Sequence, residues 1–400
     1  MLKIAVAVVG VGLVGKEVVR QLFAPALGGV FEVVMLSGSR HAVTIEHGQQ
    51  FGDAETLLAL LPPSTVWTPP HLPEGATYGS PDFDTIISSL CKSAATTGQH
   101  TILIDCTSSA ELAALYPRAL SSGLSVVTPN KKAFASSSSL YSAILDAQRE
   151  PGAGLCYHEA TCGAGLPVLS TVRDLVATGD EIVRVEGVLS GTLAYLFNQF
   201  STVGGVKEGA MAFSKIVRVA KEHGHTEPHP ADDLSGADVA RKLTILARVA
   251  SSSSQPACSS ALPSLPDLPE GNLSVPTESL VPPELAALSD PDEFLDALGE
   301  LDSALAARRD AAAKEGRVLR YVGVIDRERG ELRCGLESFP YSHPFAQSQG
   351  SYLSLAIYTR RHASSPLVIQ GPGYPLSVTA GAVVADAVRV AERRGMRVGL

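Results

Sequence analysis

The stretch Gly10-Val11-Gly12-Leu13-Val14-Gly15 decides the fold of the first part of this chain. It follows an apolar run of strand length over residues 3–9 and precedes a helical pattern of apolar residues. A G-x-G-x-x-G turn between a strand and a helix is typical of dinucleotide-binding βαβ units, although such turns also occur in units that bind nothing. Gly10 would permit the turn, Gly12 the approach of a pyrophosphate and Gly15 close helix packing, while the amides of Leu13 and Val14 would face the phosphates. The stretch predicts a Rossmann-type dinucleotide site.

The end of the next predicted strand, residues 32–36, bears on the choice of cofactor. NAD-selective sites usually carry an acid at this point, which holds the ribose hydroxyls. This chain has Ser37-Gly38-Ser39-Arg40 instead, so no carboxylate would repel a 2′-phosphate and Arg40 is placed to pair with one. The sequence favours NADP without excluding NAD. An exposed loop arginine is an equally good interpretation of Arg40.

Two further predicted strands end in small polar residues or lysine. Residues 101–105 lead into Thr107 and Ser108, and residues 124–128 lead into Lys131. Open parallel sheets bind ligands at the carboxyl ends of their strands. We therefore expect Thr107 and Ser108 at the nicotinamide half of the cofactor, and Lys131 near a substrate carboxylate or ribose. The same Thr-Ser-Ser segment is also typical of a helix N-cap, and both interpretations can hold together.

The segment 226–243 concentrates acids and one lysine where a helix is expected to begin. Asp238 and Lys242 are spaced i and i+4, so they should project together from one helix face. Two prolines in the preceding loop should hold Glu227 near the acidic pair that includes Asp233. The buried side of this helix is predicted from the spacing of Leu234, Val239, Leu243 and Leu246. An ordinary surface ion pair at a solvated helix start is the alternative interpretation.

The composition excludes several classes of protein. The chain has 400 residues, 45% hydrophobic and 18% charged, with a formal net charge of −9. This is enough for two lobes, and the acidic balance argues against a nucleic-acid partner. No apolar run approaches the roughly 20 residues that cross a bilayer, and the start of the chain leaves no room for a signal peptide. The six cysteines are scattered, which favours free thiols in a reducing, cytoplasmic compartment over a zinc site or a disulfide framework.

The pattern changes after about residue 180 and predicts a second domain. Strands are expected at residues 182–189, 319–325, 332–339 and 352–358, antiparallel and in one sheet. Helices should cover one face, and the other should carry apolar residues that a monomer would leave wet, which predicts a homodimer. A weak helix is expected over residues 290–314, and a C-terminal helix over 378–394 should return to the first domain. Residues 251–283, rich in Ser and Pro, read as a loop or flexible insertion.

The predicted fold class is α/β. A Rossmann-type dinucleotide-binding domain, residues 1–160 completed by 371–400, is combined with an α+β domain at 161–370 for substrate binding and dimerisation. The sheet of that second domain should be mixed or antiparallel.

Several motifs occur here in the order found in homoserine dehydrogenases. Besides the glycine turn they are Thr128-Pro129-Asn130-Lys131-Lys132, Glu159-Ala160-Thr161-Cys162-Gly163-Ala164-Gly165, Gly187-Val188-Leu189-Ser190-Gly191-Thr192 and the acid-lysine segment. The chain resembles the short monofunctional form, which lacks a kinase and a C-terminal regulatory domain. The resemblance implies reversible NAD(P)H-dependent reduction of L-aspartate 4-semialdehyde to L-homoserine, on the pathway to threonine and methionine.

The resemblance also implies roles for particular residues. Lys242 would donate a proton to the aldehyde oxygen, directly or through water, with Asp238 beside it. Lys131 would help to position substrate and cofactor. The remaining substrate-binding residues would be Glu227, which would take the ammonium group, with Asp233, Asp238 and Thr192. Gly371 would contact the cofactor, and a sodium ion would be held by Glu159 with the carbonyl oxygens of Cys162, Ala164 and Leu166.

Two alternatives remain open on the residues alone. One is another two-domain NAD(P)-dependent enzyme, such as an aspartate-semialdehyde or amino-acid dehydrogenase. A dehydrogenase that forms an acyl intermediate would need a nucleophilic cysteine beside a histidine base, and Cys156 and His158 have no oxyanion motif near them. The other is a nucleotide-sensing protein of the same fold, which would have lost its polar positions. Lys131, Glu227 and Lys242 are all present.

Overall fold

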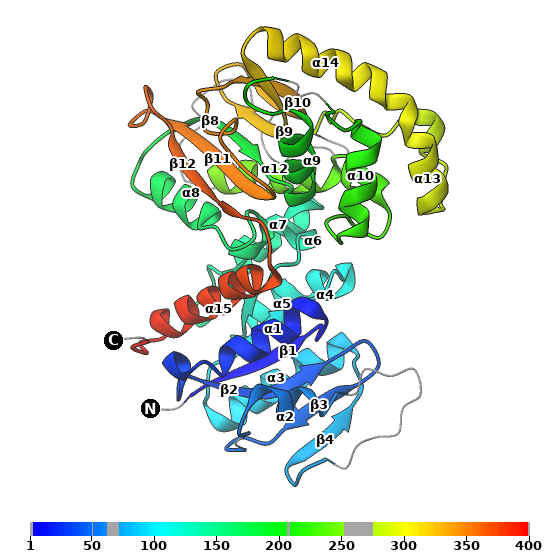
Figure 1. Cartoon of the computed structure of the whole chain (residues 1–400). Coiled ribbons are helices and arrows are strands. Elements are labelled where there is room, and N and C mark those ends of the chain that lie inside the picture. The colour runs from blue at the N-terminus through cyan, green and yellow to red at the C-terminus, as the bar shows by residue number, and fades with distance from the viewer. Residues whose placement is uncertain (1–2, 50, 62–71, 206–208, 252–274, 399–400) are drawn as a thin grey trace. The chain divides into compact units, whose positions relative to one another are not determined.

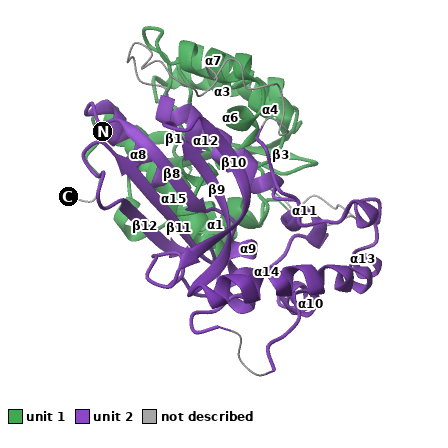
Figure 2. Cartoon of the chain, turned by 90° about the horizontal axis from the view of Figure 1, so that it is seen from above, with its two compact units in different colours: residues 1–165, 375–400 green, residues 166–374 purple. Residues whose placement is uncertain are grey.

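The structure, a computed structural model, describes residues 3–49, 51–61, 72–205, 209–251 and 275–398. The chain divides into two compact units (Figures 1 and 2). Unit 1 comprises Met1–Gly165 and Pro375–Leu400, and unit 2 comprises Leu166–Tyr374. Each unit has its own sheet, so the glycine turn at residues 10–15 lies in unit 1 and the acid-lysine segment at 226–243 lies in unit 2.

Unit 1 contains a seven-stranded sheet in the order β4-β3-β2-β1-β5-β6-β7. Its strands are β1 (Ile4–Val9), β2 (Phe31–Ser37), β3 (Ala42–Ile45), β4 (Ala76–Gly79), β5 (Thr101–Asp105), β6 (Ser125–Val127) and β7 (Cys156–Tyr157). Strands β2, β1, β5, β6 and β7 are parallel neighbours, whereas β3 and β4 pair antiparallel at one edge. Every residue of β1 is buried, as expected for a parallel strand covered on both faces.

The helical elements of unit 1 follow the strands along the chain. They are α1 (Leu13–Leu22), η1 (Pro25–Leu27), α2 (Ala54–Leu58), α3 (Phe83–Thr97), α4 (Ala110–Ala114), α5 (Tyr116–Ser121), α6 (Lys132–Ala135), α7 (Ser138–Ala147), η2 (Glu159–Thr161) and α15 (Leu376–Arg393). The C-terminal helix α15 packs on α1 and on η2. Its buried stripe includes Ala380, Val383, Ala387 and Val390, so the last helix of the chain completes the core of the first unit.

Unit 2 contains a five-stranded sheet in the order β10-β9-β8-β11-β12, and every neighbouring pair is antiparallel. Its strands are β8 (Ile182–Val188), β9 (Arg317–Asp326), β10 (Glu331–Pro340), β11 (Tyr352–Thr359) and β12 (Leu367–Pro372). The predicted fold class is confirmed, including the antiparallel joining of the late strands to the strand near Glu186. The segment 367–372, which carried no strand prediction, adds the edge strand β12.

The helical elements of unit 2 are α8 (Val168–Ala177), α9 (Gly191–Phe200), α10 (Phe213–Glu222), α11 (Pro230–Leu234), α12 (Ala237–Ser251), η4 (Pro283–Leu285), α13 (Pro291–Ala297), η5 (Leu298–Leu301) and α14 (Asp302–Lys314). The prediction of one helix over 290–314 is wrong, because a 3-10 turn separates α13 from α14. Helix α12 packs on β9, where the absence of a side chain at Gly323 leaves room for Leu243. The predicted buried stripe of this helix is confirmed, since Val239, Leu243 and Leu246 are each at most 1% exposed.

The predicted insertion at 251–283 lies in large part, at 252–274, outside the described residues. The segment that follows is anchored. Thr277 forms a bridge with Cys334 of β10, and the amide of Leu280 donates to the carbonyl of Leu234 at 2.9 Å. The expectation of a loose loop is therefore wrong for residues 275–281, because backbone hydrogen bonds attach them to the unit 2 sheet and to α11.

Candidate active-site residues

In the glycine turn at the start of α1, each of the three glycines has different steric surroundings. Gly10 has a φ of 89°, and a Cβ there would lie 2.8 Å from the Thr107 nitrogen. A Cβ on Gly15 would lie 2.3 Å from the Gly10 oxygen. A Cβ on Gly12 would meet no described atom within 4 Å, so this glycine faces open space at the helix N-terminus. The turn thus has the form that a pyrophosphate needs, with packing glycines on either side of an open one.

The loop after β2 lies at the same edge of the sheet as the glycine turn. The amides of Gly10 and Val11 donate to the carbonyl of Ser37, at 2.8 and 3.2 Å. Arg40, three residues further on, is exposed in the turn between β2 and β3. This placement is compatible with both interpretations of Arg40, the phosphate contact and the loop arginine.

The turns after β5 and β6 carry the other predicted cofactor residues. Ser109 caps α4, since its hydroxyl accepts from the Leu112 amide at 3.2 Å. Thr107 and Ser108 therefore precede the helix, in the turn that contacts Gly10. Lys131 occupies the N-cap position of α6 and is half-buried. The capping interpretation and the ligand interpretation of this segment thus apply to different residues.

The turn around Glu159 is held by two side chains of the C-terminal helix. Glu159 is 2% exposed, and its Oε2 lies 3.2 Å from Nη1 of Arg389. Asp386, 1% exposed, accepts from the Glu159 amide at 2.8 Å, and burial raises the pKa of Asp386 to about 6. Sequence reasoning did not find Asp386 or Arg389, because they lie more than 200 positions away and only the fold of α15 brings them to this turn.

The backbone of the same turn is unusual. Gly163 has a φ of 91° and Ala164 a φ of 54°, and among the described residues Ala164 is the non-glycine residue with positive φ. The Leu166 oxygen accepts from the Val168 amide at 2.8 Å, which uses one of its two lone pairs. One carboxylate and several carbonyl oxygens are the donors that a hard cation prefers. The Glu159 charge, however, is shared with Arg389.

In unit 2 the acid-lysine pair has the predicted geometry. Nζ of Lys242 lies 2.7 Å from Oδ2 of Asp238. The same Nζ donates to the carbonyl of Leu189, just after β8, at 2.7 Å. The Lys242 side chain is only 13% exposed, whereas that of Asp238 is 40% exposed. Lys242 is therefore held by two acceptors from different elements, unlike a surface lysine paired only along its own helix.

The remaining predicted substrate residues gather in front of α12. The amide of Glu227 donates to Oδ2 of Asp233 at 2.8 Å, and the hydroxyl of Thr192 donates to the carbonyl of His225 at 2.7 Å. The pKa of Asp233 is raised to about 6, mainly by burial and to a smaller extent by the nearby charges of Glu227 and Asp238. Three acids thus share one region, which is the environment that a cationic group of a ligand would relieve.

Gly371 has a packing role within unit 2. It lies in β12, is buried, and a Cβ there would lie 2.6 Å from Cδ2 of Leu166. This contact explains why glycine is required at the position without any ligand.

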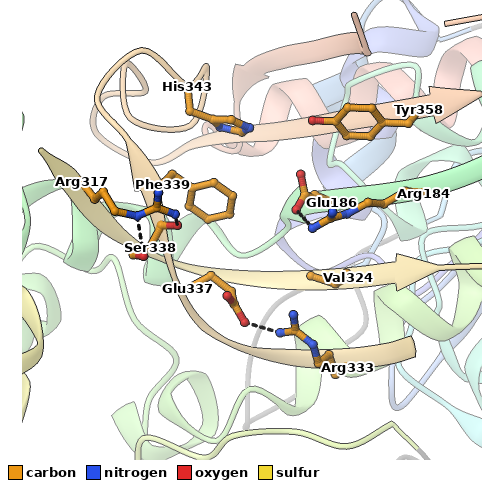
Figure 3. A pocket seen from close by; sticks show the side chains of 10 residues that line it. All are labelled: Arg184, Glu186, Arg317, Val324, Arg333, Glu337, Ser338, Phe339, His343 and Tyr358. Atoms are coloured by element: carbon orange, nitrogen blue, oxygen red, sulfur yellow. Dashed lines mark hydrogen bonds and ion pairs between the residues drawn. The ribbon is translucent and has the colours of Figure 1, made fainter. Parts of the chain in front are cut away.

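The expectation that the open face of the unit 2 sheet exposes apolar residues in a monomer is wrong. Apolar residues there are not left wet, because Val322, Val324 and Ala356 are 0%, 1% and 0% exposed in the single chain. Around Val324 lies a cavity of about 290 Å³ (Figure 3). Its lining is mostly charged or polar and consists of Arg184, Glu186, Arg317, Val324, Arg333, Glu337, Ser338, Phe339, His343 and Tyr358. The apolar residues of this face are buried in a cluster with Phe345 and Ala346, and charged side chains line the cavity beside it.

The charges of this cavity are arranged in pairs. Arg184 is ion-paired with Glu186, and Arg333 with Glu337. Burial raises the pKa of Glu186 and lowers that of His343, which also faces the cations of Arg184 and Arg317. Sequence reasoning predicted this face but not its character, because alternation tells which side a residue is on and not which neighbours cover it.

Comparison with known proteins assigns both units. The family model described as "Homoserine dehydrogenase" matches residues 167–388, and the model for the NAD-binding domain of the same enzyme matches residues 10–158. The chain belongs to the homoserine dehydrogenase family. It is 37% identical to the homoserine dehydrogenase of Saccharomyces cerevisiae over 388 residues, covering 97% of this chain and 98% of that one. The homoserine dehydrogenase of Emericella nidulans is 42% identical, with 98% and 99% covered.

Solved structures share the fold. A Candida auris protein of unknown function superimposes with a TM-score of 0.81 at 37% identity, covering 98% of this chain and 99% of that one. A hyperthermophilic archaeal homoserine dehydrogenase in complex with NADPH gives a TM-score of 0.67 at 19% identity, covering 98% of both chains, which shows the fold alone.

The chain is thus a homoserine dehydrogenase, an NAD(P)-dependent oxidoreductase that interconverts L-aspartate 4-semialdehyde and L-homoserine. The prediction from the motifs is confirmed, and the two alternatives are not supported. Across the part of the chain that the structure describes, no helix has the length and apolar character needed to cross a membrane.

Proposed function

We propose that Lys242 is the proton donor of this homoserine dehydrogenase. Hydride addition to the aldehyde leaves negative charge on its oxygen, and a positioned ammonium group can stabilise that charge and protonate it, directly or through water. The observation that carries the proposal is the pair of short contacts from Lys242 to Asp238 and to the Leu189 carbonyl. These contacts fix the Nζ of a nearly buried lysine. Asp238 is proposed to keep that ammonium charged and oriented, and also to face the substrate.

The substrate ammonium group is assigned to the acids in front of α12. Glu227 and Asp233 are joined through the Glu227 amide, and Thr192 is fixed at the start of α9 by the His225 carbonyl. Burial is the main reason for the raised pKa of Asp233, and the charges of Glu227 and Asp238 add to it. An ammonium group placed among these carboxylates would offset both the burial of that charge and the repulsion between the acids. The proposal therefore assigns Glu227, Asp233 and Thr192 to substrate binding.

Unit 1 is proposed as the dinucleotide-binding domain and unit 2 as the substrate-binding and dimerisation domain. When bound, NADPH supplies the hydride. The open Gly12, with the α1 amides of Leu13, Val14 and Gly15, suits the pyrophosphate. Thr107, Ser108 and Lys131 are assigned to the nicotinamide half, and Gly371 to a cofactor contact from its edge strand. A preference for NADP over NAD is proposed from Arg40, with no acid in the same turn.

A sodium ion is proposed at the turn that contains Glu159. The Glu159 carboxylate and the carbonyls of Cys162, Ala164 and Leu166 form a set of oxygen donors on a backbone with two consecutive positive φ angles. Thermal unfolding in sodium chloride, compared with choline chloride at equal ionic strength, tests this assignment. A wild-type midpoint that is the same in both salts argues against the ion. Glu159→Gln, which also loses the Arg389 pair, should lower the midpoint in both salts and abolish any difference between them.

A cytoplasmic homodimer joined through unit 2 is also proposed. The open face of the sheet carries both signs of charge, in the pairs Arg184 with Glu186 and Arg333 with Glu337, so a second copy of the same face can set its carboxylates against these arginines. Light scattering at micromolar protein should report about twice the chain mass of 41.7 kDa. Arg333→Glu should shift the distribution toward the monomer, and a wild-type mass of one chain contradicts the proposal.

The assay that tests the whole assignment follows NADPH absorbance with L-aspartate 4-semialdehyde as substrate. Wild-type protein should consume NADPH faster than NADH at equal concentrations. The reverse reaction, with L-homoserine and NADP, should produce the same absorbance change in the opposite direction. Reduction of NADP by the semialdehyde in the presence of phosphate, and none without phosphate, would instead indicate a semialdehyde dehydrogenase that forms an acyl intermediate on a cysteine.

A further inference from the structure

Asp105 is a buried acid that neither half of the proposed site uses directly. It is the last residue of β5 and is 0% exposed. Its carboxylate accepts from the Thr107 amide at 2.7 Å, from the Tyr116 hydroxyl at 2.5 Å and from Nδ2 of Asn130 at 3.0 Å. One carboxylate therefore joins the turn after β5, the helix α5 and the turn after β6.

Asn130 is locked in one orientation by its other contacts. Its Nδ2 also donates to the Ser109 carbonyl at 2.8 Å, and its Oδ1 accepts from the Lys132 amide at 3.0 Å. In the reversed orientation of the amide, Oδ1 would face the Ser109 carbonyl oxygen and Nδ2 would face the Lys132 N–H, so neither hydrogen bond could form. Nδ2 must therefore face Asp105, and the position of the Lys131 turn depends on that contact.

Thr128 closes the same network through the main chain. Its hydroxyl donates to the Asp105 carbonyl at 2.7 Å and accepts from the Asn130 amide at 2.8 Å. The turn after β6 is thus tied to Asp105 twice, through the carboxylate and through the main-chain carbonyl, and the turn after β5 is tied to the same carboxylate by the Thr107 amide. Residues Thr107, Ser108 and Lys131 belong to these two turns and are the ones assigned to the nicotinamide half of the cofactor.

We propose that Asp105 is a positioning residue, which holds the turns after β5 and β6 in register so that Thr107, Ser108 and Lys131 meet the cofactor together. It acts through these residues, because a side chain with no exposed surface cannot touch a ligand. The inference rests on the proposed function for the identity of the ligand, and on the hydrogen bonds alone for the coupling of the two turns.

An amide cannot replace this carboxylate. Oδ1 of Asp105 faces the Thr107 amide, and Oδ2 faces Nδ2 of Asn130. Either orientation of an asparagine at 105 would therefore set its own NH₂ against a fixed N–H donor. The Tyr116 hydroxyl can rotate and accept instead, but the two nitrogen donors cannot. The substitution should separate the two turns while it conserves shape and volume.

Asp105→Asn is therefore the test, with Asp180→Asn as the matched control. Asp180 is 3% exposed in unit 2, and its carboxylate accepts from the Thr359 hydroxyl and from the Arg361 and Glu181 amides. Both variants should lower the unfolding midpoint. Only Asp105→Asn should weaken NADPH binding, measured by nucleotide fluorescence, by roughly ten- to hundredfold, the range expected for a buried donor left unpaired. At saturating NADPH its kcat should fall while KM for the semialdehyde stays within about twofold.

Rescue distinguishes positioning from general damage. The double variant Asp105→Asn/Asn130→Asp exchanges amide and carboxylate, which restores a donor–acceptor pair at the expense of the Ser109 carbonyl. It should recover part of the lost NADPH affinity. If Asp105→Asn does not fold, Thr128→Val, which removes the hydroxyl shared by both turns, should weaken NADPH in the same direction.

An NADPH dissociation constant equal to that of wild type in folded Asp105→Asn, or in Thr128→Val where the former does not fold, overturns the inference. Failure of the proposed function has a different result. In that case the wild-type chain itself neither binds NADPH nor oxidises it with the semialdehyde.

Discussion

The two units differ in the chemical groups that they offer to a ligand. Unit 1 presents a turn whose chemistry lies in the backbone, with Gly10, Gly12 and Gly15 each placed by sterics. Unit 2 presents charged side chains, above all Asp238 and Lys242, on a helix whose other face is core. A backbone site tolerates few changes in volume, whereas a side-chain site tolerates few changes in charge. The difference predicts which substitutions harm which step.

The largest effect should come from unit 2. Lys242→Ala should lower kcat by roughly two to four powers of ten, because it removes the proton donor, and should leave NADPH affinity unchanged. Steady-state kinetics with nucleotide fluorescence measure both. Lys221→Ala is the matched control, since Lys221 is also paired with a carboxylate, Asp292, at 2.8 Å but on the surface of α10. Near-normal turnover in the Lys242 variant would remove that lysine from the mechanism.

The second-largest effect, on cofactor affinity, should come from Arg40, the charged side chain assigned to the cofactor in the turn between β2 and β3. Arg40→Ala should weaken NADPH by about 1.5–3 kcal/mol, or roughly 10- to 150-fold, because a charge-assisted hydrogen bond to the 2′-phosphate is lost. NADH, which lacks that phosphate, should bind as before. Arg118→Ala, at another exposed arginine of unit 1, serves as control. Equal losses for both cofactors would assign Arg40 to the fold or to the adenine.

A smaller effect should separate the glycines of the turn from one another. Gly12→Ala should weaken both cofactors by about tenfold, since its methyl group points into space that only a pyrophosphate would fill, and should leave the unfolding midpoint in place. Gly15→Ala should lower the unfolding midpoint, because its Cβ would meet the Gly10 oxygen at 2.3 Å. Thermal unfolding and cofactor titration of both variants test the contrast. Unchanged cofactor affinity in Gly12→Ala would mean that no phosphate approaches this turn.

The smallest effect is a pH dependence in unit 2. The pKa of Asp233, raised to about 6, means that this carboxylate loses its charge as pH falls through 6. We expect kcat/KM for L-homoserine to fall by about tenfold per pH unit below that value, because the proposed ammonium site loses the charge of Asp233. The stability effect has the opposite sign, since an acid with a raised folded-state pKa loses stability as pH rises from about 4 to 6. A profile that stays flat to pH 5, or an Asp233→Asn enzyme with the same acid limb, would contradict the assignment.

Local patterns were sufficient for most elements of the fold. The strand, turn and helix at the N-terminus, the stripe of α12 and the Asp238–Lys242 pair follow from spacing along one element, and each appears as expected. Where prediction failed, the missing information was non-local. The 3-10 turn between α13 and α14 packs on α10, and Thr277 bridges to Cys334 of β10, so both features involve neighbours far along the chain.

The open face of the unit 2 sheet shows the same limit. Alternation correctly indicated which residues share a face, yet the apolar ones are buried in the single chain by a hydrophobic cluster that includes Phe339, Phe345 and Ala346. A pattern in one strand contains no information about the side chains of the next. The proposal of a homodimer therefore rests on the charged pairs of this face and no longer on solvent-exposed apolar residues.

The sequence by itself determined the local motifs and their order. These are a glycine turn between strand and helix, an acid and a lysine one helical turn apart, and the order of motifs that identifies the family. Only the tertiary structure decided how these are held. It brings the Leu189 carbonyl to Lys242, Asp386 and Arg389 to Glu159, and the Asp105 carboxylate to two turns at once. The physical reason is that periodicity and steric preference act over a few residues, whereas a buried polar group finds its partner wherever the packed chain places one.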